Sequence, residues 1–216
     1  MSPTTKKTTA VQTAASPKKN PVKRLSQSTK SDQRRDQIVR VATEIINAKS
    51  YAQATVVEIA AALELRDATL YHYFPDKVSL AFACHEQSLA RFEKLLIATD
   101  EAGGTGAHKL RQFVRSMLRD SQNNGPLLYF GDFSYLLAPQ REILADWGTR
   151  LRKHLAKFIR EGMSDDSIVQ CEPELVVQLV LGMLIWLGRW VPSVDGMTAD
   201  RLMSAIDAVT FRGLEK

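Results

Sequence analysis

The chain has 216 residues, of which 44% are hydrophobic and 25% charged, and its formal net charge is +5. This length allows one large domain or two small ones with a substantial core. The two cysteines, Cys84 and Cys171, lie far apart with no CxxC spacing. We therefore expect buried reduced thiols rather than a disulfide framework or a metal site.

Most of the positive charge lies in the first 35 residues, which hold nine Lys or Arg and one acid, a net of +8, and leave −3 for the remainder. Residues 1–30 are rich in Thr, Ser, Pro and Lys, a composition that predicts a disordered basic arm. They contain no apolar run typical of a secretory signal. A solvated tail without a role stays open for residues 1–20. Over residues 23–35, including Arg34 and Arg35, we favour an arm that contacts DNA.

Two helices are expected to follow the arm. Five apolar residues recur at helical spacing between residues 32 and 49: Ile38, Val41, Ala42, Ile45 and Ile46. This stripe predicts the first helix. Thr55 followed by Glu58 forms a capping-box pattern ahead of an apolar run, so we expect the second helix to begin at Thr55.

A third helix is expected to end at Pro75, because proline removes a backbone donor. Leu70 and Phe74 are four residues apart and share one face, while Thr69 and His72 point away from it. Two short helices joined by a tight turn form the helix-turn-helix arrangement, in which the second helix enters the major groove of DNA. We therefore expect the polar, aromatic face of the third helix to read DNA.

The stretch IAAALELRDATLYHYFPDK, residues 59–77, resembles the amino-terminal signature of the TetR family of transcriptional regulators. The resemblance implies an all-α fold. A three-helix helix-turn-helix DNA-binding domain would cover residues 31–78, and a larger helical effector-binding and dimerisation domain would cover residues 79–216. The chain departs from the family at Glu64, where Gly is usual in the turn, and at Arg66, where Ser or Thr often caps the recognition helix. A non-glycine residue with positive φ carries modest strain.

The predicted DNA-contacting residues combine the arm with positions that the resemblance implies. They are Arg34, Arg35, Thr55, Arg66, Asp67, Thr69, Tyr71, His72, Tyr73 and Lys77. Residues 36–77 nevertheless carry a net charge of −2. Since phosphate neutralisation supplies most non-specific affinity, we expect the basic arm to provide the positive field, and such an arm can reach the minor groove.

Helices are expected throughout the rest of the chain. They run from residue 76 to about 100, from the loop at 101–106 to the GlyPro break at 125–126, from about 139 to 161, and from about 198 to 212. The glycine-rich loop follows a helix and lacks the GKS or GKT ending of a phosphate loop. We expect this loop to be flexible, with Thr105 capping the helix that follows. Gly162 is expected to end the helix that runs from about residue 139 to 161.

The segment from residue 175 to 190 is apolar on nearly every side. Its uninterrupted apolar core is about a dozen residues, short of the ~20 that a membrane span needs, so no membrane is expected. A helix that is apolar all round must be buried all round. This favours a homodimer interface shared with the last helix, with the central helix of a monomeric bundle as the alternative. The predicted interface residues are Leu179, Gly182, Met183, Trp186, Trp190, Leu202, Ile206 and Val209.

The family resemblance also implies a ligand cavity among the middle helices. Residues suited to its wall are Phe92, Phe113, Met117, Tyr129, Phe130, Phe133, Tyr135 and Trp147, although aromatic residues at helical spacing also form ordinary core. The tail, with its sequence LGMLIWLGRWVP, resembles a TetR branch that responds to acyl-CoA thioesters. A small hydrophobic or acyl-CoA-like effector is therefore expected.

The sequence gives no sign of an enzyme. It contains neither GxSxG nor HExxH, and its four histidines are scattered, so we expect no catalytic, metal-binding or cofactor-binding residues. We expect instead a cytoplasmic, nucleoid-associated bacterial repressor that binds a near-palindromic double-stranded DNA operator as a homodimer and is released by its effector. Two alternatives remain open: a non-specific architectural DNA-binding protein, and a small-molecule-binding protein without DNA activity.

Overall fold

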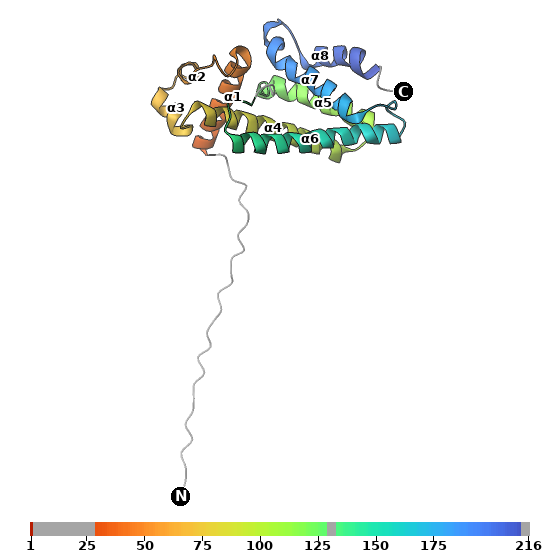
Figure 1. Cartoon of the computed structure of the whole chain (residues 1–216), viewed down its shortest axis with the longest axis horizontal. Coiled ribbons are helices and arrows are strands. Elements are labelled where there is room, and N and C mark those ends of the chain that lie inside the picture. The colour runs from red at the N-terminus through yellow and green to blue at the C-terminus, as the bar shows by residue number, and fades with distance from the viewer. Residues whose placement is uncertain (2–28, 129–132, 213–216) are drawn as a thin grey trace.

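The computed structural model describes residue 1 and residues 29–128 and 133–212, and these residues form helices joined by short loops, with no β-strand among them (Figure 1). The expected all-α fold is confirmed. Residues 2–28 of the predicted basic arm lie outside the described part of the chain. The arm was predicted to extend to residue 30, whereas the first helix already begins at Lys30.

Three helices form the amino-terminal unit: α1 (Lys30–Lys49), α2 (Val56–Ala62) and α3 (Asp67–Tyr73). Helix α1 begins two residues earlier than predicted because Thr29 and Asp32 cap each other. The Thr29 hydroxyl accepts from the Asp32 amide at 3.1 Å, and the Asp32 carboxylate accepts from the Thr29 amide at 3.0 Å. This reciprocal pair satisfies two amide donors at the helix start.

The turn between α2 and α3 contains a non-glycine residue with positive φ. Glu64 has a φ of 55°. Its amide donates to the Ala61 oxygen at 3.0 Å, and the Leu65 amide donates to the Ala60 oxygen at 2.9 Å. These two bonds form a Schellman motif, in which the left-handed residue is usually glycine. The glutamate that replaces the family's usual glycine therefore holds a left-handed backbone conformation.

A shared core holds the three helices together. Its fully or almost fully buried members come from all three helices and the turn after α3: Ile38, Ala42, Ile46, Ile59, Ala60, Leu70 and Phe74. Leu70 and Phe74 thus share a buried face as predicted. Because this face is fixed, the opposite face of α3 has a defined orientation.

The rest of the chain consists of α4 (Lys77–Ala102), α5 (Gly106–Asn124), α6 (Ala138–Ser164), α7 (Pro173–Trp190) and α8 (Ala199–Ile206), which a π-helical turn extends over Asp207–Phe211. A 3₁₀ turn, Val191–Ser193, follows α7. The α1–α3 unit lies at one end of an elongated helical body (Figure 1). The predicted domain boundary at residues 78–79 falls inside the first turn of α4, so one helix joins the two domains.

The glycine at position 162 does not end α6, which was the prediction. The helix continues to Ser164, and Gly162 is buried. A Cβ atom on Gly106 would lie 2.1 Å from the Gly162 nitrogen, and one on Gly162 would lie 2.5 Å from Cδ1 of Ile168. Gly162 therefore serves the close approach of α5 to α6 rather than a helix stop.

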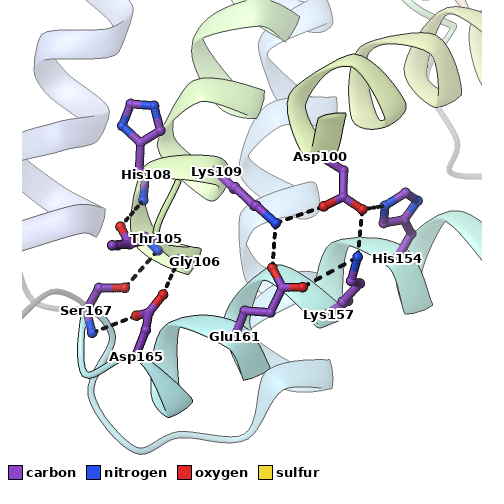
Figure 2. Close-up of polar contacts among 11 residues, drawn as sticks. Asp100, Thr105, Gly106, His108, Lys109, His154, Lys157, Glu161, Asp165 and Ser167 are labelled. Carbon is purple, nitrogen blue, oxygen red and sulfur yellow. Dashed lines mark hydrogen bonds and ion pairs between the residues drawn. The ribbon is translucent and has the colours of Figure 1, made fainter. Parts of the chain in front are cut away.

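A network of charged side chains joins α4, α5 and α6 at the end of the body away from α1–α3 (Figure 2). The Asp100 carboxylate accepts from Lys109 at 2.8 Å, from Lys157 at 2.7 Å and lies 2.9 Å from His154 Nε2. Lys109 also donates to Glu161 at 2.8 Å. Hydrogen bonds from Lys109 and Lys157 hold the pKa of Asp100 well below its usual range. The network fixes the far end of α4.

Helix α7 exposes several apolar side chains in the single chain. Leu175, Leu179 and Trp186 are 54%, 67% and 54% exposed. The segment Pro173–Ser193 has a mean hydropathy of 1.7 and is long enough by length and composition to cross a membrane. Excluding a span on length alone was therefore wrong. One such helix in the described residues is weak evidence for a span, because interface and core helices have the same composition.

Candidate DNA-binding surface and effector cavity

Helix α3 presents a polar and aromatic face to solvent. Tyr71 is 49% exposed, Asp67 and His72 are exposed, and Thr69 and Tyr73 are half-buried. The His72 ring meets the Tyr73 ring edge-on, with 5.6 Å between ring centroids. Since the other face of α3 is packed on α1 and α2, these side chains stand where a recognition helix would meet base edges.

Three predicted contact residues flank this face. Thr55 caps α2 by accepting from the Glu58 amide at 3.1 Å, and its hydroxyl can still donate to a phosphate. Arg66 is exposed before α3 and makes no capping hydrogen bond. The Lys77 ammonium lies 4.2 Å from the centroid of the Tyr51 ring, and burial lowers the pKa of Lys77. The lysine is thus held in place at the start of α4.

Arg34 and Arg35 belong to the first turns of α1 rather than to a flexible arm. Arg34 donates to Gln37 Oε1 at 2.9 Å. The Arg35 guanidinium lies 4.8 Å from the centroid of the Phe74 ring, which anchors α3. Within the described residues, both arginines therefore have fixed positions beside the helix-turn-helix unit.

A cavity of about 610 Å³ lies among α4, α5, α6, α7 and the start of α8. Its volume is within the range of roughly 300–1,000 Å³ that is usual for small-molecule sites. Most of the wall is aliphatic or aromatic, including Leu89, Leu118, Leu151, Leu184 and Ile185. Several wall residues of α7 are exposed, so the cavity is open on that side.

The structure places three of the predicted pocket residues on the cavity wall: Phe92, Met117 and Phe133. Phe113 is fully buried and packs edge-on against Phe92, with 4.9 Å between centroids. Tyr135 and Trp147 are half-buried and do not line the cavity. Tyr129 and Phe130 lie outside the described residues. Most of the α7 residues that line the cavity were not predicted from the sequence.

The predicted interface residues separate into three groups: exposed, half-buried and buried. Leu179, Trp186 and Val209 are 67%, 54% and 83% exposed, and Gly182 is exposed, with no atom within 4 Å of where its Cβ would be. Met183 and Trp190 are half-buried. Leu202 and Ile206, at 9% and 5% exposure, are buried inside their own chain, where α8 packs on α5. These two residues therefore do not belong to the exposed face.

Comparison with known families matches both halves of the chain. Residues 38–84 match the family described as "Bacterial regulatory proteins, tetR family", and residues 103–214 match "Tetracyclin repressor-like, C-terminal domain". The chain belongs to the TetR family. The expected family and the helix-turn-helix arrangement are thereby confirmed, and membership of this family of regulators supports a non-enzymatic role.

Individual relatives of this TetR-family chain agree with that assignment. A relative from Aromatoleum sp. (strain CIB), the HTH-type transcriptional regulator HbdR, is 25% identical over 131 residues, which are 60% of this chain and 57% of HbdR. The chain thus spans less than two thirds of the length of this relative. The structure of the TetR-family regulator PfmR from Thermus thermophilus has a TM-score of 0.67 and 25% identity, covering 83% of this chain and 99% of PfmR.

Two more distant structures share the TetR fold. KstR2 of Mycobacterium tuberculosis, a ketosteroid transcriptional regulator, has a TM-score of 0.72 at 16% identity over 85% of this chain and 95% of its own. AibR, in complex with isovaleryl coenzyme A and operator DNA, has a TM-score of 0.69 at 19% identity over 82% of this chain and 98% of its own. At these identities the likeness concerns the fold.

One junction between the TetR-type domains involves residues that the sequence did not single out. Arg189 follows the cavity residue Gly188 in α7 and donates to the main-chain oxygens of Asn47, at 2.9 Å, and of Ala48. The side-chain amide Nδ2 of Asn47 donates to the Leu127 oxygen at 2.8 Å, and Leu127 also lines the cavity. The last turn of α1 is therefore tied to two walls of the cavity.

A second junction consists of stacked rings. The Tyr51 and Tyr135 rings are parallel, with 3.7 Å between centroids and an interplanar angle of 8°. The Tyr135 hydroxyl lies 2.8 Å from His85 Nε2, and Phe133 of the cavity wall meets the His85 ring edge-on at 4.9 Å. Burial lowers the pKa of His85 to about 4. Since Lys77 lies over Tyr51, aromatic contacts run from the cavity to the start of α4.

Proposed function

We propose that this chain is a ligand-responsive transcriptional repressor that binds a near-palindromic operator as a dimer and leaves it when an effector enters the cavity. The observation that carries the proposal is the pair of hydrogen bonds from Arg189, beside the cavity, to the last turn of α1 in the helix-turn-helix unit. Through this contact, a ligand that displaces α7 would also displace the last turn of α1 in the DNA-binding unit.

The exposed face of α3 would lie in the major groove. Tyr71 and His72 project from it toward base edges, while Thr55 and Lys77 flank it at positions suited to phosphates. Residues 36–77 have a net charge of −2, so this surface supplies shape and hydrogen bonds rather than a positive field. The basic residues before Thr29 would supply that field and most of the salt dependence of binding.

A second copy of the chain would cover the apolar face of α7. Leu175, Leu179 and Trp186 expose side chains that water solvates poorly, and Val209 exposes another at the carboxy-terminal end. Contiguous apolar surface of this kind marks association sites. A two-fold dimer would place two α3 helices for two half-sites, which implies a near-palindromic operator.

The effector would be hydrophobic, with an acyl-CoA thioester as the class to test first. The mostly aliphatic wall supports an apolar body. The fold similarity to AibR, whose structure holds isovaleryl coenzyme A, supports a thioester. An effector that prefers a conformer with wrongly spaced α3 helices would shift the dimer off its operator, by as much as its affinities for the two conformers differ.

The site of action would be the bacterial cytoplasm, at the nucleoid, where the operator lies. Family membership supports a cytoplasmic DNA-binding protein. Association with the nucleoid follows from operator binding and needs no further anchor.

The decisive experiment is fluorescence anisotropy with labelled DNA from upstream of the chain's own gene, with a scrambled duplex of equal length as competitor. We expect saturable binding that the scrambled duplex does not displace. Tyr71→Ala should weaken binding by about 1–3 kcal/mol, as expected for the loss of a base contact. The matched control is Ile97→Ala, which shortens an exposed side chain of α4 that is not among the predicted DNA-contacting residues.

The same assay separates the alternatives. Equal displacement by scrambled DNA would indicate an architectural DNA-binding protein. Absence of binding to any duplex, with ligands still entering the cavity, would indicate a small-molecule-binding protein. Deleting residues 1–28, which leaves the Thr29 cap intact, should lower affinity and flatten its dependence on salt. An unchanged salt dependence would remove the arm from the proposal.

A further inference from the structure

The wall of the cavity carries a single charged side chain among the described residues, that of Arg152 on α6. The other polar wall residues are neutral: Ser121, Gln122, Gln178 and Thr198. No carboxylate lines the cavity within the described residues. Within the described residues, the wall of this mostly apolar space therefore carries one formal charge, that of the Arg152 guanidinium.

The position of Arg152 is fixed by its own helix. Its Nη2 donates to Thr149 Oγ1 at 2.8 Å, and the Thr149 hydroxyl donates onward to the Ala145 oxygen at 2.8 Å. Nη1 lies only 3.3 Å from where a Cβ atom of Gly148 would be. Gly148 also lines the cavity. Because Gly148 has no Cβ atom, the Arg152 guanidinium can lie against this glycine, one turn before the Arg152 backbone.

The charge of Arg152 is not balanced by an acid. The structure shows no ion pair of Arg152 with a carboxylate of the described residues, whereas Arg91 and Arg111 are paired with Asp120 and Asp207. Arg152 is half-buried, and among the described residues its side chain donates one hydrogen bond, to a neutral hydroxyl. An arginine carries five N–H donors, so most of its capacity remains for a ligand.

We propose that the cavity binds an amphipathic anion, with its apolar body on the aliphatic wall and its negative group paired with Arg152. This inference rests on the proposed effector role of the cavity and narrows its ligand class. A planar guanidinium matches carboxylate and phosphate oxygens in two parallel hydrogen bonds. Ligands that are apolar throughout would leave this charge without a partner.

Two sources can supply the anion: the carboxylate of a free hydrophobic acid and the phosphates of a coenzyme A thioester. Both have an apolar acyl body, and they differ in where the negative charge stands. A free acid brings its charge next to the acyl chain. A thioester places its first phosphate at the far end of the pantetheine arm, so its acyl carbon would lie deeper than the guanidinium.

Two fluorescent probes with the same ring skeleton test the inference: 8-anilinonaphthalene-1-sulfonate, which carries a sulfonate, and N-phenyl-1-naphthylamine, which does not. Each is titrated into the full-length protein and into the variants Arg152→Met and Arg150→Met. Arg150 is exposed and does not line the cavity, so its variant controls for loss of a positive charge. Circular dichroism confirms that each variant is folded.

We expect Arg152→Met to weaken binding of the sulfonate probe by roughly ten- to hundredfold, the loss typical of a hydrogen bond to a charged group. Binding of the neutral probe should stay within about twofold, and Arg150→Met should change neither probe. Equal effects of Arg152→Met on both probes would overturn the inference while leaving the effector cavity in place. If neither probe enters the wild-type cavity, the proposed effector role fails, and the inference fails with it.

Displacement of the sulfonate probe then identifies the source of the anion. Dodecanoic acid, dodecanoyl coenzyme A and dodecan-1-ol are added to wild type and to Arg152→Met. Displacement by the acid that Arg152→Met abolishes assigns the charge to a carboxylate, and the same pattern with the thioester alone assigns it to phosphate. Displacement by the alcohol as strong as by both anions would contradict an anion site.

Discussion

The Arg189 guanidinium donates a hydrogen bond to the main-chain oxygen of Asn47 at 2.9 Å, across 142 residues of sequence. The same guanidinium reaches the Ala48 oxygen. These carbonyls belong to the last turn of α1, whose oxygens have no amide partner within the helix. Arg189 thus provides a positive charge at the negative end of α1, and it does so from the helix that forms one wall of the cavity.

Arg189→Met should loosen the last turn of α1 without unfolding the protein. The lost hydrogen bonds come from an exposed side chain to main-chain oxygens, so we expect a decrease of about 1 kcal/mol in the free energy of unfolding. Hydrogen exchange should become faster in residues 46–55 and remain unchanged in α5. Arg201→Met is the matched control, because Arg201 also donates to a main-chain oxygen, that of Gly196, away from α1. Faster exchange in both variants would contradict a specific role for Arg189.

Lys109→Met should destabilise the protein more than Lys157→Met, although both lysines bond Asp100. The Lys109 side chain is 11% exposed and bridges Asp100 and Glu161, whereas the Lys157 side chain is 50% exposed. Lys157 also pairs with both Asp100 and Glu161, so removing Lys109 takes away the more buried of the two bridging lysines and leaves these partly buried carboxylates with the exposed one, at a cost of about 2 kcal/mol. An exposed pair contributes only about 0.5 kcal/mol. Urea denaturation measures the free energy of unfolding of the two variants. Equal losses would show that the burial of the lysine does not determine its contribution to stability.

His85 should make the stability of the protein depend on pH in the mildly acidic range. Burial lowers its pKa from 6.5 to about 4 in the folded chain. As the pH falls below 6.5, the unfolded chain takes up this proton before the folded chain does. The contribution of neutral His85 is therefore complete above pH 6.5 and is lost as the pH falls toward 4.

The variant His85→Gln tests this dependence in urea denaturation at about pH 7.5 and about pH 5. The fall in the free energy of unfolding between the two should be smaller than in wild type. Tyr135→Phe, which keeps the buried imidazole, should retain the larger fall. A fall of wild-type size in His85→Gln would assign the pH dependence to other groups.

Glu64→Gly should stabilise the chain, because Glu64 holds a φ of 55° at the position where a Schellman motif usually has glycine. Relief of the left-handed strain contributes about 1 kcal/mol, which outweighs the added freedom of the unfolded chain. Glu64→Ala keeps a Cβ atom at the same φ and should show no such gain. Thermal unfolding of the three proteins measures the effect. A gain in Glu64→Ala equal to that in Glu64→Gly would point to the charge rather than the backbone.

Local patterns predicted the helix boundaries well where the decisive contact lies within a few residues. Thr105 caps α5 as expected, by accepting from the His108 amide, and Asp76, where the next helix was expected to begin, caps α4 by accepting from the Ser79 amide. The buried pairing of Leu70 with Phe74 follows from helical spacing alone. In these cases the sequence neighbours are also the spatial neighbours.

Predictions that depend on distant contacts were less complete. Gly162 resembles a helix stop, but its small size serves the approach of Gly106 from another helix. Leu202 was predicted to lie in the interface because it is apolar and at helical spacing, but α5 covers it within the same chain. Hydrophobicity shows that a side chain is buried without showing what buries it. The contact of Arg189 with Asn47 had no local signal, since neither residue is unusual in its own helix.

Helix α4 runs without a break from the helix-turn-helix unit to the far end of the helical body, so a small rotation of this helix gives a displacement comparable with the spacing of DNA bases. Its 26 residues make a rod about 39 Å long, with Lys77 at the helix-turn-helix end and Asp100 held by charged partners near the other. Asp100 lies about 34 Å from Lys77 along the helix, so a tilt of about 6° around Asp100 carries Lys77 through about 3.5 Å, close to the rise of one base along a DNA strand. A change too small to alter the core can therefore shift the protein by one step along the groove.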